Sequence, residues 1–188
     1  MWKPLMSLEI VSTLAAVGTF IVIAATAIAA IVQLRHMRAS NQLEGLLVVL
    51  KELESEKVNR WVTQTQHELP KMMNDPAYVQ SIIDESFDRN VAWLQLANEY
   101  ERVGSLLKYN LIPEELFLDV YWGRAVQAWN LMLPLTSLAR SAMGNAVWEN
   151  FEYIYIRAKA FRDRYPDGNY PHGVPRAEVP PFRSTHVA

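Results

Sequence analysis

The stretch that decides the fold is IVSTLAAVGTFIVIAATAIAAIVQL, residues 10–34, which holds 25 consecutive residues without a formal charge. As an α-helix it would reach about 37 Å, which exceeds the roughly 30 Å thickness of the hydrocarbon core of a bilayer. A backbone in lipid must satisfy its own hydrogen bonds, so a single apolar span has to be helical. The sequence therefore predicts one transmembrane helix over residues 10–34.

A cleaved signal peptide is the alternative interpretation of this stretch. Such a peptide has a basic start and an apolar region of only about 7 to 15 residues. Here the single basic side chain of the N-terminal flank, Lys3 in residues 1–9, is offset by Glu9, and the apolar stretch is longer. Ala27 and Ala29 could imitate a cleavage site. The length nevertheless favours a span that is retained.

The charges on either side of the span predict its orientation. Arg35 and Arg38 follow it directly, whereas Lys3 is the only basic side chain before it. Positive side chains near a membrane helix accumulate on the cytoplasmic side. We therefore expect the part of the chain that follows the span to lie in the cytoplasm.

Residues 35–164 have the periodicity of amphipathic helices. Apolar side chains recur there at intervals of three and four residues, and we find no alternating strand pattern. The most regular stripe consists of Trp93, Leu96, Ala97, Tyr100, Val103, Gly104 and Leu107. Asp75-Pro76, Asn110, Pro113 and Gly144-Asn145 carry the residue types that start and stop helices. The predicted fold class is all-α, with one transmembrane helix followed by a bundle of about five helices.

Several details of the bundle can be predicted as well. The helix that leaves the membrane is expected to continue without a break through Glu44 to Trp61, which would couple the domain rigidly to the span. Pro70 and Pro134 are each expected to bend or end a helix. Gly104 lies on a buried stripe, so two helices are expected to approach closely there, and a larger side chain should destabilise the fold.

The C-terminal segment, residues 165–188, differs in composition from the helical domain at residues 35–164. It holds half of the ten prolines of the chain, together with turn signals at Asp167-Gly168 and His172-Gly173. It is therefore predicted to be an irregular, Pro-rich tail. We expect the part around Tyr170 to pack back on the bundle and the end after about Arg183 to be disordered.

Most kinds of catalytic or metal site have no support in the sequence. Without cysteine there can be no disulfide, thiolate metal site or cysteine nucleophile. No His-x3-His or Glu-x2-His pair, as a di-iron bundle requires, falls on a predicted helix. With a net charge of -2, the chain lacks the strongly basic character of nucleic-acid-binding domains. We predict no catalytic residue, no metal site, no cofactor and no nucleic-acid partner.

Arg124 is the most unusual of the polar residues. It falls on the apolar stripe of its predicted helix, between Tyr121 and Ala128. A buried cation needs a partner, and Glu101 and Glu152 lie near the edges of other apolar stripes. Our hypothesis is a structural ion pair between Arg124 and one of these carboxylates. The alternative is that Arg124 binds an anionic ligand, which makes these three residues the candidate ligand-binding residues.

Three short motifs carry a resemblance to a known family. They are ERVGSLLKY at residues 101–109, LIPEELFLD at residues 111–119 and WENFEY at residues 148–153. With them the chain resembles a bacterial family of uncharacterised single-span membrane proteins, whose helical domain is of unknown function. The resemblance covers roughly residues 39–175 and the preceding span. It implies a bacterial inner membrane as the location and implies no activity, so no catalytic residue is carried over.

Three functions are compatible with this pattern. The leading hypothesis is a membrane-anchored interaction or scaffold protein, whose partners are the lipid bilayer through residues 10–34 and a protein partner or further copies of the chain. The second is a single-span sensor that binds a small molecule or lipid between helices, which a deep apolar pocket near Arg124 would favour. The third is an enzyme with an unfamiliar carboxylate site around Glu101 and Glu152, which is less expected than a non-enzymatic role.

Overall fold

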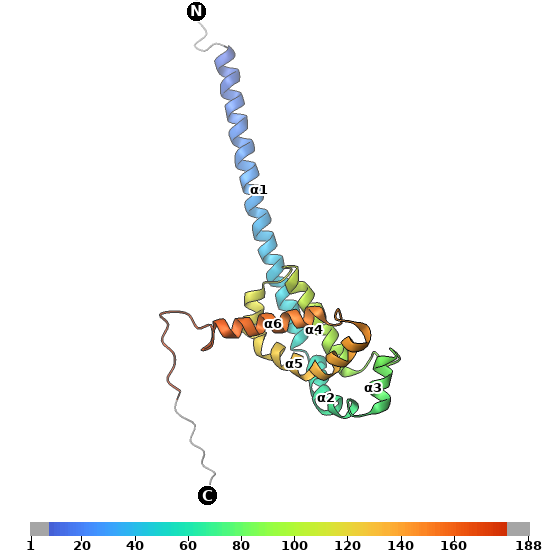
Figure 1. The fold of residues 1–188 in the computed structure, drawn as a ribbon. Coiled ribbons are helices and arrows are strands. Elements are labelled where there is room, and N and C mark those ends of the chain that lie inside the picture. The colour runs from blue at the N-terminus through green and yellow to red at the C-terminus, as the bar shows by residue number, and fades with distance from the viewer. Residues whose placement is uncertain (1–7, 180–188) are drawn as a thin grey trace, which may run out of the picture.

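The structure, a computed structural model, describes residues 8–179, and its regular elements are six helices (Figure 1). These are α1 (Leu8–Leu53), α2 (Glu56–Met72), α3 (Pro76–Ile83), α4 (Ala92–Lys108), α5 (Glu114–Met143) and α6 (Glu149–Arg164). This part of the chain contains no strand. The predicted all-α fold, with one long apolar helix leading into a bundle, is confirmed.

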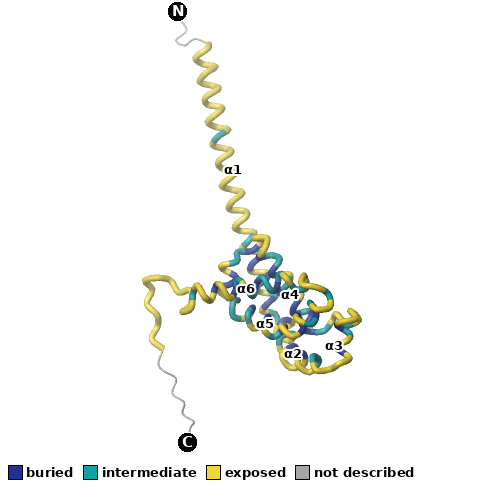
Figure 2. The backbone as a smooth tube through the Cα atoms, viewed as in Figure 1, coloured by how far each residue is buried: buried dark blue, intermediate teal, exposed yellow. Residues whose placement is uncertain are grey.

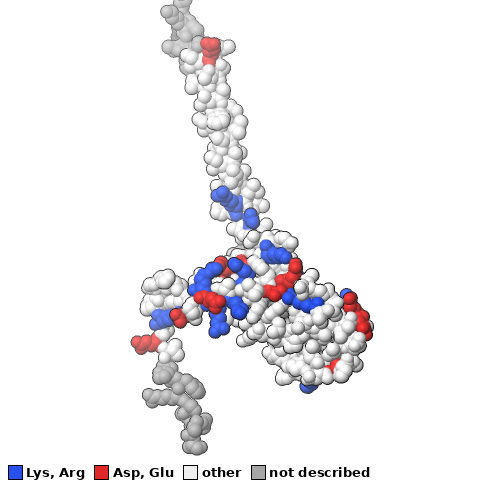
Figure 3. All heavy atoms as spheres, viewed as in Figure 1, with Lys and Arg blue, Asp and Glu red and all other residues white. Residues whose placement is uncertain are grey.

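Helix α1 stands away from the bundle over most of its length (Figure 2). Its most apolar window has a mean hydropathy of 2.5, and none of that window is buried against the rest of the protein. By length and composition it is the one helix among residues 8–179 that could cross a membrane. Figure 3 shows an uncharged surface along α1 between an acidic group at its outer end and basic groups where the helix approaches the bundle.

The end of α1 differs from the sequence-based expectation. The helix stops at Leu53, and α2 starts at Glu56 with Ser55 as its cap, whose Oγ accepts a hydrogen bond from the Val58 N–H at 3.3 Å. Leu53 and Val58 are each only 2% exposed. In one continuous helix two residues five apart would point about 140° away from each other. The break lets both face the same core, so the predicted continuation to Trp61 is wrong beyond Leu53.

The core of the bundle forms where α4, α5 and α6 meet. Helix α4 packs against α6 and α2, while α5 packs against α6 and α3. The fully buried Phe151 of α6 stacks on Tyr100 of α4 at 4.7 Å between ring centres and meets Trp129 of α5 edge-on at 5.1 Å. Helix α1 adds only side chains from its last turns, namely Leu46, Val49 and Leu53. The bundle is therefore organised around α4, α5 and α6, with α1 joined to its edge.

Three of the predicted helix boundaries are confirmed. The Asp75 side chain accepts a hydrogen bond from the Ala77 N–H at 2.9 Å, and Pro76 is the first residue of α3. Asn110 follows α4 with a φ of 53°, and Gly144 follows α5 with a φ of 95°. Both lie in the left-handed range of φ that Asn and Gly tolerate after a helix.

Other boundaries differ from those predicted. Helix α6 begins at Glu149 and not directly after Asn145, because Trp148 takes a left-handed φ of 53° just before it. Each proline was expected to bend or end its helix, and neither ends it, since α2 continues through Pro70 to Met72 and α5 continues through Pro134 to Met143. A proline frees the carbonyl four residues earlier, and in both cases that residue, Gln66 or Asn130, is exposed and can be hydrated.

The tail leaves the bundle after α6, as its composition predicted (Figure 1). Residues 166–179 are exposed and contain no helix. Tyr170 is 44% exposed, and its hydroxyl donates to the Pro175 carbonyl at 3.3 Å, within the tail itself. The expectation that this part packs back on the bundle is therefore wrong. The region after Arg183 lies outside the described residues.

Candidate functional site

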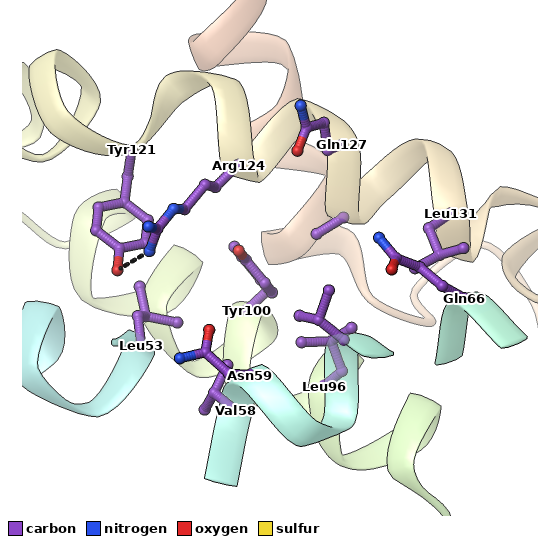
Figure 4. A pocket seen from close by; sticks show the side chains of 12 residues that line it. Leu53, Val58, Asn59, Gln66, Leu96, Tyr100, Tyr121, Arg124, Gln127 and Leu131 are labelled. Carbon is purple, nitrogen blue, oxygen red and sulfur yellow. Dashed lines mark hydrogen bonds between the residues drawn. The ribbon is translucent and has the colours of Figure 1, made fainter. Parts of the chain in front are cut away.

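A cavity of about 230 Å³ lies between α2, α4 and α5, close to the end of α1 (Figure 4). Its apolar walls come from Leu53, Val58, Val62, Leu96, Ala128 and Leu131. Its polar groups come from Asn59, Gln66, Tyr100, Tyr121, Arg124 and Gln127. The cavity therefore combines apolar walls with hydrogen-bonding groups, in the place beside Arg124 where a sensor pocket would be expected.

Arg124 contributes the only cation to the lining of this cavity. Its Nη1 donates a hydrogen bond to the Tyr121 hydroxyl at 3.0 Å, and its guanidinium lies 5.2 Å from the centre of the Tyr121 ring. None of the ion pairs among the described residues includes Arg124. The predicted pair with a glutamate is therefore wrong. The physical reason is that Arg124 is exposed, so water solvates its charge and no carboxylate is required.

Glu101 has a structural position at the start of α6. Its Oε2 accepts hydrogen bonds from the backbone N–H groups of Asn150 at 3.0 Å and Phe151 at 2.9 Å. Its Oε1 accepts a third, from the side-chain amide of Asn150 at 2.7 Å. A carboxylate here satisfies free N–H groups and complements the positive end of the helix dipole. Glu101 thus caps α6 from α4 and is not part of the cavity.

Glu152 is also engaged elsewhere. Its Oε2 lies 2.9 Å from Nη1 of Arg140 in an ion pair. The Nε–H of Arg140 also donates a hydrogen bond to the Val147 carbonyl at 2.9 Å. This arrangement ties the end of α5 to the loop before α6. Of the three candidate residues, only Arg124 lines the cavity, so the carboxylate cluster that an enzymatic site would need does not form around Glu101 and Glu152.

Two tyrosine hydroxyls complete the polar part of the cavity. Tyr100 is 3% exposed and Tyr121 is 1% exposed, and both contribute to the lining. Burial raises the pKa of both phenols, and the nearby Arg124 opposes this only in part. The carboxylates of Glu99 near Tyr100 and Glu54 near Tyr121 raise the pKa values further. Both hydroxyls therefore stay protonated at neutral pH and can donate hydrogen bonds. The sequence pattern marks both residues as core, which explains why their polar role was missed.

The side chains that line the cavity include a cation and no acid. Its lining holds one guanidinium, two neutral phenols and three side-chain amides, but no carboxylate. Guanidinium and hydroxyl donors form their strongest hydrogen bonds with carboxylate or phosphate oxygens. Residues 8–179 contain no group of three or more His, Asp or Glu side chains that could hold a metal ion. The guanidinium and hydroxyl donors that line the cavity are suited to binding an anion.

Comparisons with known proteins place the chain in a family. Searches of curated proteins and of solved structures returned no match. A scan of protein families gave a match over residues 20–158, which include the second half of the apolar stretch and every residue that lines the cavity. That family is described as Domain of unknown function (DUF4760). Because the match covers most of the sequence, the chain belongs to the DUF4760 family.

Proposed function

We propose that this protein is a single-pass membrane protein whose helical domain binds a small anion in the cavity beside Arg124. The observation that carries the proposal is a guanidinium without a carboxylate partner, set next to two protonated phenols in a cavity lined by no acid. The single-span sensor is thus favoured over the other functions that the sequence allows.

The membrane part of the proposal rests on α1. Its apolar stretch, residues 10–34, is long enough for a bilayer and is not covered by the bundle. Arg35 and Arg38 support a cytoplasmic position for the bundle. The resemblance carried by residues 101–119 and 148–153 supports a bacterial inner membrane as the location.

The size of the cavity limits the ligand. A dry cavity of roughly 150 Å³ can hold one benzene molecule. The cavity here, at about 230 Å³, has room for a body of that size with a carboxylate or phosphate group attached. The apolar side chains on α2 and α4 would contact the body, and Arg124 with Tyr100 would bind the charged group. We therefore propose a ligand of about one ring in size with one anionic group.

The other two hypotheses have less support. The interaction or scaffold role stays a prediction, since it depends on a partner that is still to be identified. An enzymatic role around Glu101 and Glu152 would need carboxylates free to react, but the first caps α6 and the second pairs with Arg140. The anion-binding proposal uses a residue, Arg124, that has no such structural task.

Replacing Arg124 by Met tests the proposal directly. In the full chain, held in mild detergent and titrated with phenyl phosphate, Arg124→Met should weaken binding about tenfold or more, because it removes a charge-assisted hydrogen bond worth about 1.4 kcal/mol. Benzamide, a neutral ring of similar size, should bind more weakly than phenyl phosphate and be unaffected by the substitution. Calorimetric titration measures both affinities.

A second arginine provides the matched control. The Arg60 side chain on α2 is 68% exposed and does not line the cavity, so Arg60→Met should leave phenyl phosphate binding unchanged. Circular dichroism should show an intact fold for both variants, because Arg124 has no ion pair to lose. Equal phenyl phosphate affinity in wild type and Arg124→Met, or no binding of phenyl phosphate at all, would contradict the proposal.

A further inference from the structure

The turn between α4 and α5 is held firmly against α1. The Gln42 side chain donates a hydrogen bond to the Asn110 carbonyl at 2.6 Å. Beside it Ile112 is 2% exposed, and a Cβ at Gly45 would lie 3.2 Å from its Cγ2, closer than ordinary van der Waals contact, so α1 and the turn pack tightly there. These contacts of Gln42 and Gly45 therefore set the position of the turn along α1.

A groove runs along α1 from this turn towards the apolar stretch. Its volume is about 510 Å³, and its lining reaches from Asn110 on the turn to Leu34, the last residue of the apolar stretch. Between them it includes Tyr109, Leu111 and Arg38. Figure 1 shows the turn at the end of the bundle from which α1 emerges. The turn is thus the part of the bundle that faces the bilayer.

Three largely apolar side chains at this end of the bundle are uncovered. Tyr109 is 68% exposed and Leu111 is 57% exposed, while Met37 on α1 beside them is 60% exposed. Their neighbour Ile112 is part of the hydrophobic core, whereas these three side chains lie outside it. Tyrosine is enriched at the level of lipid headgroups, because its side chain has an apolar ring and a polar hydroxyl.

The distances along α1 bring this surface close to the headgroups. Gln42, which holds the turn, lies eight residues after Leu34, or about 12 Å along the helix. Tyr109 precedes Asn110 in the turn and lines the same groove as Leu34. The apolar stretch exceeds the hydrocarbon core by about 7 Å, so α1 has length to spare for a tilt. A tilt towards the turn would bring the turn, which otherwise lies a few ångströms beyond the headgroup layer, into that layer.

We propose that the α4–α5 turn docks on the bilayer surface, with Tyr109 and Leu111 inserted among the headgroups of anionic phospholipids. Arg35 and Arg38 lie between Leu34 and Gln42 on α1, on the membrane side of the turn, and attract the negative surface. The inference rests on the membrane anchoring proposed above but not on the anion-binding cavity. Docking gives the domain a second membrane contact and fixes its orientation about α1.

Single cysteines can report the depth of each site, because the chain has no cysteine of its own. We would place a spin label at position 111 in the full chain, through Leu111→Cys, and reconstitute it in vesicles of phosphatidylcholine and phosphatidylglycerol. Ile83→Cys is the matched control, since Ile83 is an apolar residue that is 46% exposed, and its helix α3 lies away from the end of the bundle where α1 emerges (Figure 1). Val22→Cys reports whether α1 itself is in lipid.

Accessibility to oxygen and to a water-soluble nickel chelate measures the depth of each label. We expect the oxygen-to-nickel ratio at position 111 to be about threefold or more above that at position 83 and below that at position 22. Tyr109→Cys should behave as Leu111→Cys does, and a lower ratio at both is expected in vesicles of phosphatidylcholine alone.

The three labels separate the possible failures. A label at position 111 that is as accessible to nickel as the label at position 83, while position 22 is in lipid, overturns docking and leaves the anchor intact. A water-accessible label at position 22 overturns the membrane anchoring and the docking together. Neither result would bear on phenyl phosphate binding beside Arg124, which is measured separately.

Discussion

Gly104→Leu is expected to lower the free energy of unfolding by about 3 kcal/mol or more, because it forces atoms into the closest approach between two helices. A Cβ at Gly104 would overlap the Asn150 carbonyl oxygen and lie 2.5 Å from its carbon. The obstacle is the backbone at the start of α6, which cannot move aside as a flexible side chain would. Even Gly104→Ala should be destabilising, although alanine is the better helix former.

Urea unfolding of the full chain in detergent, followed by near-ultraviolet circular dichroism, would measure this loss. Gly123 is the matched control, because it lies within α5 and a Cβ there would meet nothing within 4 Å. Gly123→Ala should stabilise the protein by about 0.5 to 1 kcal/mol through helix propensity alone. If Gly104→Ala also stabilised the protein, α4 and α6 could not be as close as described.

Glu101→Ala should cost about 2 to 3 kcal/mol of stability, the second largest effect that we expect. It removes three hydrogen bonds at the start of α6, two of them from the backbone N–H groups of Asn150 and Phe151. Trp148, the residue before α6, makes no side-chain hydrogen bond to the start of the helix and so does not replace the lost cap. The free N–H groups at this helix end would then lack their acceptor.

The same unfolding measurement distinguishes this cap from an ordinary surface charge. Glu115→Ala is the control, since its pair with Arg164 is exposed, with side-chain exposures of 56% and 50%, and should contribute at most about 1 kcal/mol. Glu101→Gln keeps an acceptor oxygen but not the charge, so it should fall between Glu101→Ala and wild type. A loss no larger for Glu101→Ala than for Glu115→Ala would show that α6 does not depend on this cap.

The sequence predicts those parts of the fold that depend on local chemistry. The stop at Asn110 and the start at Asp75-Pro76 follow from conformations that these residues favour by themselves. The burial of Gly104 follows from its place on the apolar stripe of α4. Helix class, several boundaries and the long apolar helix could therefore be predicted without knowing how the helices meet.

Features that depend on how helices meet could not be predicted. Glu101 receives its hydrogen bonds from residues about fifty positions away, and the sequence does not reveal that α4 passes the start of α6. For the same reason Arg124 was expected to pair with a carboxylate. Periodicity gives the face of a helix but not the exposure of its edge, and it cannot predict a cavity left where three helices pack imperfectly.

The length of α1 beyond the apolar stretch also sets the distance between the bilayer and the cavity, and this distance indicates where the ligand comes from. Leu53, which lines the cavity, comes 19 residues after Leu34 on the same helix, or about 28 Å further along its axis. A headgroup layer extends only about 5 to 8 Å from the hydrocarbon boundary. With the bilayer edge at Leu34, a molecule dissolved in the membrane could not reach the cavity, so its ligand would arrive by diffusion through water.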